Sequence, residues 1–251
     1  MTLGRVIIFT GSGISVESGI PTYRTDNGTW ENHDIEKVCT FNTYHTNETL
    51  VHNFYNDARR KLMSTRPDGS RLIQPNDAHR HVATWQKEYG ATIFTQNVDD
   101  LHEQAGAKDV IHLHGRLQDM KCLSCDTIWD NGWGDTKPHE IFCPNCGSDD
   151  VKPGVVFFGE KAPLYQELMK TISTLRPEDV VIVIGTSGQV IPIDIFLSAY
   201  SCKRYLINKE PLNGYPMTPG MEHIWSEVLY GDATYRVPQV SRILADLKQE
   251  T

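Results

Sequence analysis

Short apolar runs alternate with longer amphipathic stretches along the 251 residues of the chain, and this alternation restricts the fold more than any other feature. Four runs have the length and composition of buried parallel strands, at residues 6–9, 92–95, 180–184 and 205–207. Helical patterns lie between and after them, at residues 49–63, 79–89, 164–175 and 193–199, and a last helix is expected to start at Pro238. The pattern predicts an α/β protein with a doubly wound, Rossmann-like parallel sheet.

Two segments interrupt this alternation. Residues 34–78 have the pattern of a helix followed by a loop, and residues 119–152 contain two pairs of cysteines. We expect both segments to be insertions that together build a smaller lobe, helical in the first part and a zinc ribbon in the second. The chain is then one domain over residues 1–251, with its Rossmann-like part at residues 1–33, 79–118 and 153–251.

The paired cysteines indicate a metal site. Two CxxC pairs are separated by residues 126–142, and this spacing is typical of a tetrahedral zinc site with four thiolate ligands, Cys122, Cys125, Cys143 and Cys146. No fifth ligand or open position is apparent, so we expect one structural zinc ion that takes no part in the chemistry. Zinc-bound thiols indicate a reducing compartment, and Cys39 and Cys202 are expected to be free.

Charge and hydropathy exclude several classes of partner. The formal net charge is −8, and no cluster of Lys and Arg is present, so a nucleic-acid-binding surface is not expected. A cationic partner such as a lysine-rich segment is weakly favoured, although an acidic surface also serves solubility alone. No apolar stretch approaches the roughly 20 residues of a membrane span, and no signal peptide is visible. We expect a cytoplasmic protein with no membrane partner.

A glycine-rich turn follows the first expected strand. Gly11, Ser12 and Gly13 stand directly after it, where backbone NH groups at a strand-to-helix turn are able to approach a phosphate. The third glycine of a dehydrogenase fingerprint is missing, because Val16 occupies its position. Taken alone, the turn is equally compatible with a tight connection that binds nothing.

Polar residues follow the second expected strand. Gln96, Asn97 and Asp99 stand at the carboxyl end of the sheet, where open α/β sheets bind their ligands. His112 and His114 follow and fall on the same side of an extended segment. A histidine that faces a cofactor pocket is able to accept a hydroxyl proton near neutral pH. The alternatives are an ordinary polar loop with Asp99 as a helix cap, and structural histidines.

The motifs taken together carry a family resemblance. The segments GSGISVESGIPTYR, TQNVDDLH, HLHG, the CxxC pairs, KPGVVFFGE, IGTSGQV and IN occur in this order from about Val6 to Val237. This ordered set resembles the sirtuins of bacterial or phage type, which are NAD-dependent protein deacylases. The resemblance implies a Rossmann-like domain and a small zinc lobe, with NAD and an acyl-lysine protein or peptide meeting in the cleft between them.

The resemblance also implies roles for individual residues. His114 matches the catalytic base, and Asn97 and Asp99 match catalytic residues that hold nicotinamide and ribose. The products that the resemblance implies are free lysine, nicotinamide and O-acyl-ADP-ribose. The segment that pairs with the substrate backbone corresponds to Val155, Val156, Phe157, Phe158 and Gly159. The positions that match NAD-binding residues are Gly11, Ser12, Gly13, Ser15, Pro21, Thr22, Tyr23, Arg24, Trp30, Gln96, Asn97, Val98, Asp99, Gly185, Thr186, Ser187, Asn208, Lys209, Glu210 and Ala233.

The acyl group is less well defined by the resemblance. Tyr55 is similar to a tyrosine of sirtuins that prefer succinyl or malonyl lysine, but Ala58 stands where those enzymes have arginine. Arg59, one position further along the helix, is expected either to reach a distal carboxylate or to lie in solvent. Cys39 falls where that class has a small alanine. Ser12, Tyr23 and Lys152 also replace the usual Ala, Phe and Arg of the family.

Three alternatives compete with a deacylase. An NAD hydrolase or a protein ADP-ribosyltransferase is possible on the same fold, but His114 and the expected peptide-pairing segment favour deacylation. A zinc-ribbon binding module without catalysis belongs to a different class. A dehydrogenase is the weakest alternative, because the third glycine is missing. We expect the protein to act as a monomer.

Overall fold

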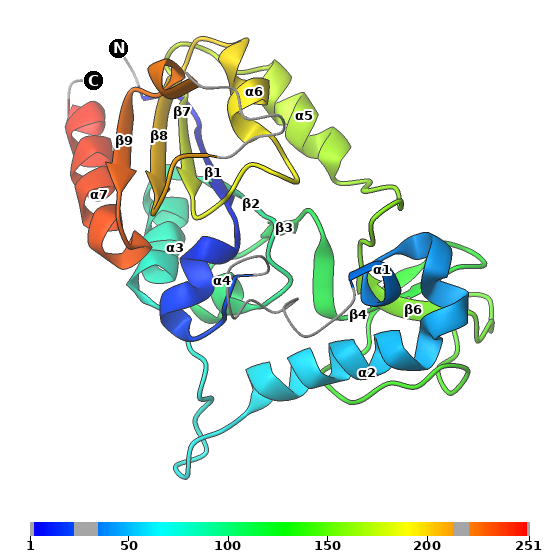
Figure 1. Cartoon of the computed structure of the whole chain (residues 1–251). Coiled ribbons are helices and arrows are strands. Elements are labelled where there is room, and N and C mark those ends of the chain that lie inside the picture. Colours follow the sequence, from blue (N-terminus) through cyan, green and yellow to red (C-terminus); the bar gives the residue numbers. More distant parts are fainter. Residues whose placement is uncertain (1–2, 23–34, 213–220, 250–251) are drawn as a thin grey trace.

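The computed structural model describes residues 3–22, 35–212 and 221–249, and its larger part is built on a parallel sheet (Figure 1). The sheet has six strands in the order β3-β2-β1-β7-β8-β9. All neighbouring strands pair in parallel. The strands are β1 (Val6–Thr10), β2 (Thr92–Thr95), β3 (Ile111–His112), β7 (Val180–Ile184), β8 (Lys203–Asn208) and β9 (Glu227–Tyr230). The four predicted strands are thus confirmed, and the edge strand β9 was not predicted.

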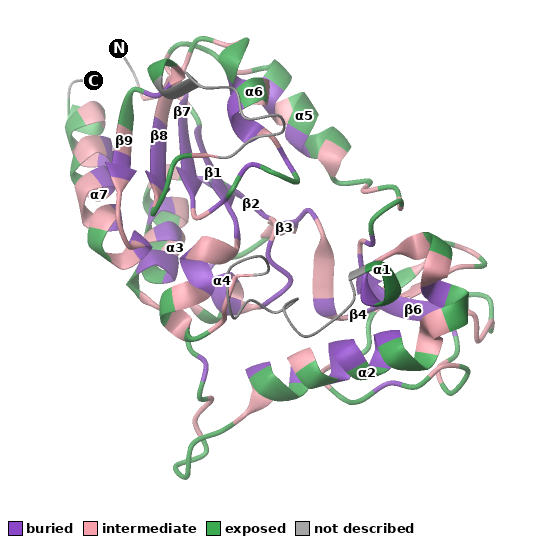
Figure 2. Cartoon of the chain, in the orientation of Figure 1, coloured by how far each residue is buried: buried purple, intermediate pink, exposed green. Residues whose placement is uncertain are grey.

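Helices cover both faces of this sheet (Figure 1). One face carries α3 (Asp77–Tyr89) and α7 (Ala233–Gln249), and the other carries α5 (Tyr165–Ser173) and α6 (Ile193–Ser198). Alternate residues of β1 divide between the faces, because Ile8 packs with the first helix pair and Ile7 and Phe9 with the second. The central strands are therefore buried throughout, as Figure 2 shows. The predicted doubly wound α/β fold is confirmed.

The last helix begins earlier than the sequence predicted. We expected Pro238 at its first position, but α7 starts at Ala233 and contains Pro238. Glu17 accepts hydrogen bonds from the backbone NH and the hydroxyl of Thr234, and so satisfies a free donor in the first turn. Ala233 and Val237 then extend the buried stripe of the helix. These tertiary contacts offset the backbone hydrogen bond that a proline removes.

The smaller lobe combines a second sheet with helices. The sheet has the order β5-β4-β6, with both pairs antiparallel. The elements of this lobe are α1 (Ile35–Val38), the 3₁₀ turn η2 (Phe41–Thr43), α2 (Tyr44–Met63), β4 (Gly115–Cys122), β5 (Ile128–Asp130) and β6 (Val151–Val155). Its sheet therefore includes residues 115–118 and 153–155, which the sequence assigned to the Rossmann-like part.

A buried polar network ties α2 to the loop of the zinc ribbon. The Arg59 side chain is fully buried. Its Nε donates to the Leu117 carbonyl oxygen at 2.6 Å, and its Nη1 donates to Asn56 Oδ1 at 2.9 Å and to Thr136 Oγ1 at 3.2 Å. His52 Nδ1 lies 2.8 Å from the same threonine hydroxyl. Buried hydrogen bonds thus contribute to holding the small lobe together.

Three short segments complete the chain: the 3₁₀ helix η1 (Ser12–Ser18) after β1, α4 (Leu101–Gln104) and the 3₁₀ helix η3 (Met221–Ile224). Within the described parts of the chain, no helix is both long enough and apolar enough to cross a membrane.

Candidate active site

A cavity of 820 Å³ lies where the carboxyl ends of the large sheet face the small lobe. Its lining comes from stretches far apart in the sequence, among them Gly11, Tyr55, His114, Phe157 and Gly185. This is the position at which open parallel sheets bind their ligands. The first predicted insertion, residues 34–78, therefore supplies one wall of the cavity together with residues 155–160, and the ends of the sheet strands supply the other. None of the described lining residues comes from the second insertion, residues 119–152.

Two glycine turns meet at the centre of this wall, after β1 and β7. These strands are neighbours, and the chain leaves them toward opposite edges of the sheet. Gly13 donates its backbone NH to the Gly185 carbonyl at 2.8 Å. A Cβ on Gly13 would lie 2.6 Å from the Gly185 Cα, and a Cβ on Gly185 would lie 2.4 Å from the Ile14 nitrogen. The contact requires glycine on both sides and leaves a backbone-lined hollow at the switch point.

Polar side chains form the floor beside this hollow. Asn97 Nδ2 donates to Ser15 Oγ at 3.1 Å, and Ser15 Oγ donates to Asp99 Oδ2 at 3.1 Å. His79 Nε2 lies 3.4 Å from the same hydroxyl. Among the described residues, the buried Asn97 Oδ1 has no hydrogen-bond partner. An unsatisfied amide oxygen in a cavity wall fits a ligand that carries NH donors, as the nicotinamide amide does.

Burial shifts the pKa values of the ionisable side chains in this floor. Desolvation raises the pKa of Asp99 to about 6, against the hydrogen bonds from the Leu101 NH and from Ser15. Burial also lowers the pKa of His79 to about 3, so this imidazole is neutral. A carboxyl group with a pKa near neutrality at a cavity wall is typical of functional sites.

The two histidines that follow β2 have different surroundings. Burial opposes the charge on His112, but Glu103 Oε1 at 2.8 Å and the Asn97 carbonyl at 2.8 Å outweigh it and raise its pKa. Burial lowers the pKa of His114, whose Nδ1 donates to the Gln96 carbonyl at 2.9 Å. His114 is therefore neutral with the proton on Nδ1, and its Nε2 lone pair is on the cavity side, where the Tyr165 hydroxyl lies 2.6 Å away.

The far end of the cavity lies beyond β7 and β8. Thr186 Oγ1 accepts a hydrogen bond from Gln96 Nε2 at 2.9 Å, and Asn208 Nδ2 donates to the Thr186 carbonyl at 2.8 Å. Lys209 pairs with Asp232 at 2.5 Å, just before Ala233. These contacts hold Thr186, Asn208 and Lys209 in one part of the cavity wall. The sequence predicted that these residues bind the adenosine end of NAD.

The predicted peptide-pairing segment is less regular than a strand. Only Val155 belongs to β6. Phe158 forms an isolated parallel bridge with Thr40, and Gly159 lies in a turn. Val156 donates its NH to the His114 carbonyl at 2.9 Å. The buried Lys152 ammonium donates to the Val155 carbonyl at 2.6 Å and lies 3.1 Å from Glu160, which accepts from the Phe157 NH. Lys152 thus holds the segment from beneath.

The wall beside Tyr55 is mainly apolar. The Tyr55 ring stacks on Phe157 with centroids 5.8 Å apart, and its hydroxyl lies 3.3 Å from Cys39 Sγ. Ala58, Lys61 and other side chains of α2 also line this wall. Arg59 does not, because the network described above keeps its guanidinium inside the small lobe. The prediction that Arg59 reaches a distal carboxylate is wrong, since a shift of one helical position turns its side chain away from the cavity.

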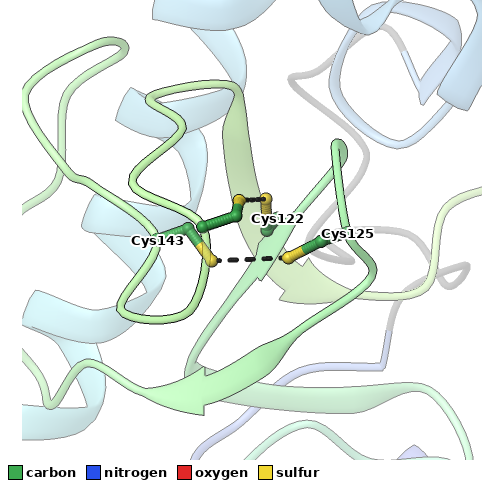
Figure 3. A group of neighbouring side chains, drawn as sticks. Cys122, Cys125 and Cys143 are labelled. Atoms are coloured by element: carbon green, nitrogen blue, oxygen red, sulfur yellow. Dashed lines mark hydrogen bonds between the residues drawn. The ribbon is translucent and has the colours of Figure 1, made fainter.

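The four predicted zinc ligands lie together. All four Sγ atoms are within 4.8 Å of one another, with 3.6 Å between Cys122 and Cys146 and 3.6 Å between Cys125 and Cys143 (Figure 3). Tetrahedral zinc with bonds of about 2.3 Å places its sulfur ligands about 3.8 Å apart. The residues present fit one structural zinc ion at the junction of β4 with the loop before β6.

Most predicted NAD and substrate residues line the cavity. Ser15 lies beneath it and contacts it through Asn97 and Asp99. Tyr23, Arg24 and Trp30 lie outside the described residues. Sequence reasoning missed His79, which Asn76 positions through a capping box at the start of α3, and Tyr165, which lies 2.6 Å from His114 Nε2. The Asn-x-x-His spacing was a detectable signal for His79, whereas no sequence motif marks Tyr165.

Comparisons with known proteins agree with this geometry. Residues 11–192 match the model of the Sir2 family. An NAD-dependent protein deacylase of Helicobacter hepaticus is 35% identical over 258 residues, which cover 96% of this chain and 97% of the relative. The likeness therefore extends over both lobes.

Solved structures are similar over the same extent. A Sir2 homologue in complex with NAD has a TM-score of 0.77 and 30% identity, covering 96% of this chain and 90% of that one. A Sir2 variant with a deacetylated p53 peptide and 3'-O-acetyl-ADP-ribose has a TM-score of 0.71 and 25% identity, covering 95% and 93%. The chain thus belongs to the Sir2 family of sirtuins.

Proposed function

We propose that the protein removes acyl groups from lysine side chains in an NAD-dependent reaction, with His114 as the base. The observation that carries the proposal is the orientation of His114, whose Nδ1 is fixed by the Gln96 carbonyl while Nε2 faces the cavity. The names of the relatives and the Sir2 complexes with NAD support the reaction. The products are free lysine, nicotinamide and O-acyl-ADP-ribose.

NAD, when bound, supplies a ribose carbon that is activated by the departure of nicotinamide. Gly11, Gly13 and Gly185 carry no side chain and so leave room for its phosphates, while their own backbone NH groups donate to carbonyls of the fold. Asn97 Oδ1, which has no donor among the described residues, is placed to accept from the nicotinamide amide, and Asp99 is placed to bind a hydroxyl. Thr186 and Asn208 form the wall expected for adenosine.

His114 is suited to remove a proton from a ribose hydroxyl. Neutral imidazole with the proton on Nδ1 has one acceptor, Nε2, and burial favours this neutral form. The carbonyl of Gln96 keeps the ring in this orientation during the reaction. A base of lowered pKa remains deprotonated down to mildly acidic pH, so activity is expected to persist below pH 6.5.

The substrate lysine enters along residues 155–159 in this proposal. Backbone pairing with this segment fixes the peptide with little dependence on its sequence. Phe157 and Tyr55 supply apolar surface for the alkyl part of the side chain. A Sir2 relative with a deacetylated p53 peptide supports an acyl-lysine peptide as the partner.

Acetyl-lysine is the proposed substrate, and Lys61 is the cation that a longer, acidic acyl group would meet. Lys61 lines the α2 wall together with Tyr55 and Ala58. We expect Lys61→Ala to reduce succinyl-lysine turnover by up to about fivefold, the range of a solvated ion pair, and to leave acetyl-lysine turnover unchanged. Lys87→Ala, on α3, is the matched control. An equal effect on succinyl-lysine and acetyl-lysine turnover would show that Lys61 does not recognise the acidic acyl group.

The experiment that tests the function measures lysine and nicotinamide release from an acetyl-lysine peptide, with and without NAD. We expect both products from the wild type and neither from His114→Ala, while His45→Ala, which changes an exposed histidine of α2, remains active. Nicotinamide release without free lysine would overturn deacylation in favour of NAD hydrolysis or ADP-ribosyl transfer.

We also propose that the protein works as a monomer in a reducing compartment such as the cytoplasm, without nucleic acid. The described lining of the cavity includes residues from both lobes of the chain. Four thiols are available for zinc only if they are reduced. Sedimentation of the zinc-loaded protein at micromolar concentration tests the monomer.

A further inference from the structure

A tyrosine hydroxyl is hydrogen-bonded to His114 Nε2, the nitrogen that must accept a proton in the proposed reaction. The hydroxyl of Tyr165 lies 2.6 Å from His114 Nε2, and the two ring centroids are 5.8 Å apart. Tyr165 is the first residue of α5 and lines the same cavity. Its ring packs on the apolar cluster beneath α5 and α6, and its backbone NH donates to the Ala162 carbonyl at 3.1 Å. The hydroxyl is thus held in place by the fold.

The direction of this hydrogen bond follows from the other contact of the imidazole. The Gln96 carbonyl only accepts, so His114 Nδ1 carries the proton and the neutral Nε2 accepts. Burial raises the pKa of Tyr165 to about 12, so the phenol keeps its proton and donates it. Nε2 has a single lone pair, and the phenol therefore fills the position that a ribose hydroxyl must take.

The other titratable groups near His114 have partners of their own. Asp99, at the end of β2, accepts from Ser15, and His112 is paired with Glu103. Glu160, between the substrate segment and α5, is paired with Lys121 and Lys152. Burial lowers the pKa of His114, and among the described residues the hydrogen bond to the Gln96 carbonyl acts in the opposite direction. Tyr165 is thus the titratable side chain in direct contact with the base.

We infer that Tyr165 is a positioning residue that holds His114 through Nε2 in the cofactor-free enzyme and yields this atom to the ribose hydroxyl when NAD binds. The inference rests on the proposed role of His114 as the base. A donor to the lone pair stabilises the neutral imidazole and keeps the ring turned toward the cavity. The same bond competes with the cofactor, because it must break before the ribose hydroxyl is able to donate to Nε2.

Tyr165→Phe removes the hydroxyl and keeps the ring packing. We expect the pKa of His114 in the ligand-free protein to rise by about 0.5 to 1 pH unit, as loss of one hydrogen bond to the neutral form predicts. The KM for NAD is expected to fall by about fivefold, the effect of one competing hydrogen bond, with kcat changed less than twofold. The low-pH limb of kcat/KM is expected to move to higher pH together with the imidazole.

The test is a ¹⁵N NMR titration of the histidines in the zinc-loaded, ligand-free protein, followed by steady-state kinetics against NAD. Tyr200→Phe is the matched control, because Tyr200 packs on the same apolar cluster and is not part of the cavity lining. An unchanged His114 titration in Tyr165→Phe would overturn the contact. A large loss of kcat with unchanged KM would also overturn the inference, because it would make Tyr165 a proton relay. The titration needs no turnover, so its outcome is separate from that of the deacylation assay.

Discussion

The large sheet and the small lobe are stabilised in different ways, although they share one cavity. The sheet is buried on both faces by aliphatic side chains such as Ile8 and Ile182, which are completely inaccessible to solvent. The small lobe has an apolar cluster under α2, but it also buries the Arg59 guanidinium and is expected to hold zinc. Its stability therefore depends on a few specific groups, whereas that of the sheet is spread over many contacts.

Zinc removal is expected to give the largest difference in stability between the small lobe and the large sheet. Chelation, or Cys125→Ser, is expected to unfold the β4-β5-β6 sheet, because structural zinc contributes on the order of 10 kcal/mol to such sites. Hydrogen exchange should show lost protection in β4 and β6 and retained protection in β1 and β7, together with loss of deacylation. Cys202→Ser is the control. Uniform loss of protection over the whole chain would contradict two separate modes of stabilisation.

A cavity in the large sheet should lower the stability of the whole molecule. Ile182→Ala in β7 is expected to reduce the free energy of unfolding by about 4 kcal/mol, because a fully buried aliphatic side chain is truncated in a close-packed core. Urea unfolding measures this change. Ile195→Ala, on the outer side of α6 with 38% exposure, should have little effect. A loss below about 1 kcal/mol would mean that the core relaxes around the gap.

Removing the buried cation of the small lobe should have a smaller effect. Arg59→Met removes the guanidinium donor to the Leu117 carbonyl and the Arg59 bonds to Asn56 and Thr136, which remain bonded to each other, and we expect a loss of about 3 kcal/mol. Hydrogen exchange should place this loss in α2 and β4. Arg60→Ala is the matched control, because the Arg60 side chain is exposed in the next position. An increase in stability would show that apolar packing replaces the network without penalty.

The smallest effect concerns acid stability. Burial lowers the pKa of His52 to about 4, against contributions from the carbonyls of Val151 and Thr136 and from Glu48. Between pH 6.5 and 4 the folded state therefore binds fewer protons than the unfolded chain, and the free energy of unfolding falls as the pH is lowered. His52→Gln should make this fall shallower by about 1 kcal/mol per pH unit. Unfolding curves at pH 7, 6 and 5 measure it, and an unchanged slope would exclude His52.

The same contrast explains what the sequence predicted. The strands β1, β2, β7 and β8 were predicted because burial on both faces gives continuous apolar runs. The cysteine pairs predicted the metal site because zinc needs four ligands at close range. His114 was identified by its place at the end of a strand and by the family resemblance. In each case the signal is local in the sequence.

The missed features depend on contacts between distant residues. The early start of α7 depends on Glu17, and the inward turn of Arg59 depends on Thr136 and the Leu117 carbonyl. Tyr165 contacts His114 across 51 positions of the sequence. Helical periodicity describes the face of one helix, but it does not specify which neighbour that face meets.

The pairing of β1 with β7 also has a consequence for biosynthesis. Ile8 lies beside Ile182, and the Gly13 NH donates to the Gly185 carbonyl. The first strand therefore cannot pair along this edge until a segment more than 170 residues further along the chain has been synthesised. Closing so long a loop is slow, and it requires nearly three quarters of the chain to have left the ribosome. Until then β1 has an unpaired apolar edge, which makes the nascent chain a client for chaperones. A prematurely terminated product would contain the glycine turn and the zinc ribbon but no assembled nucleotide site.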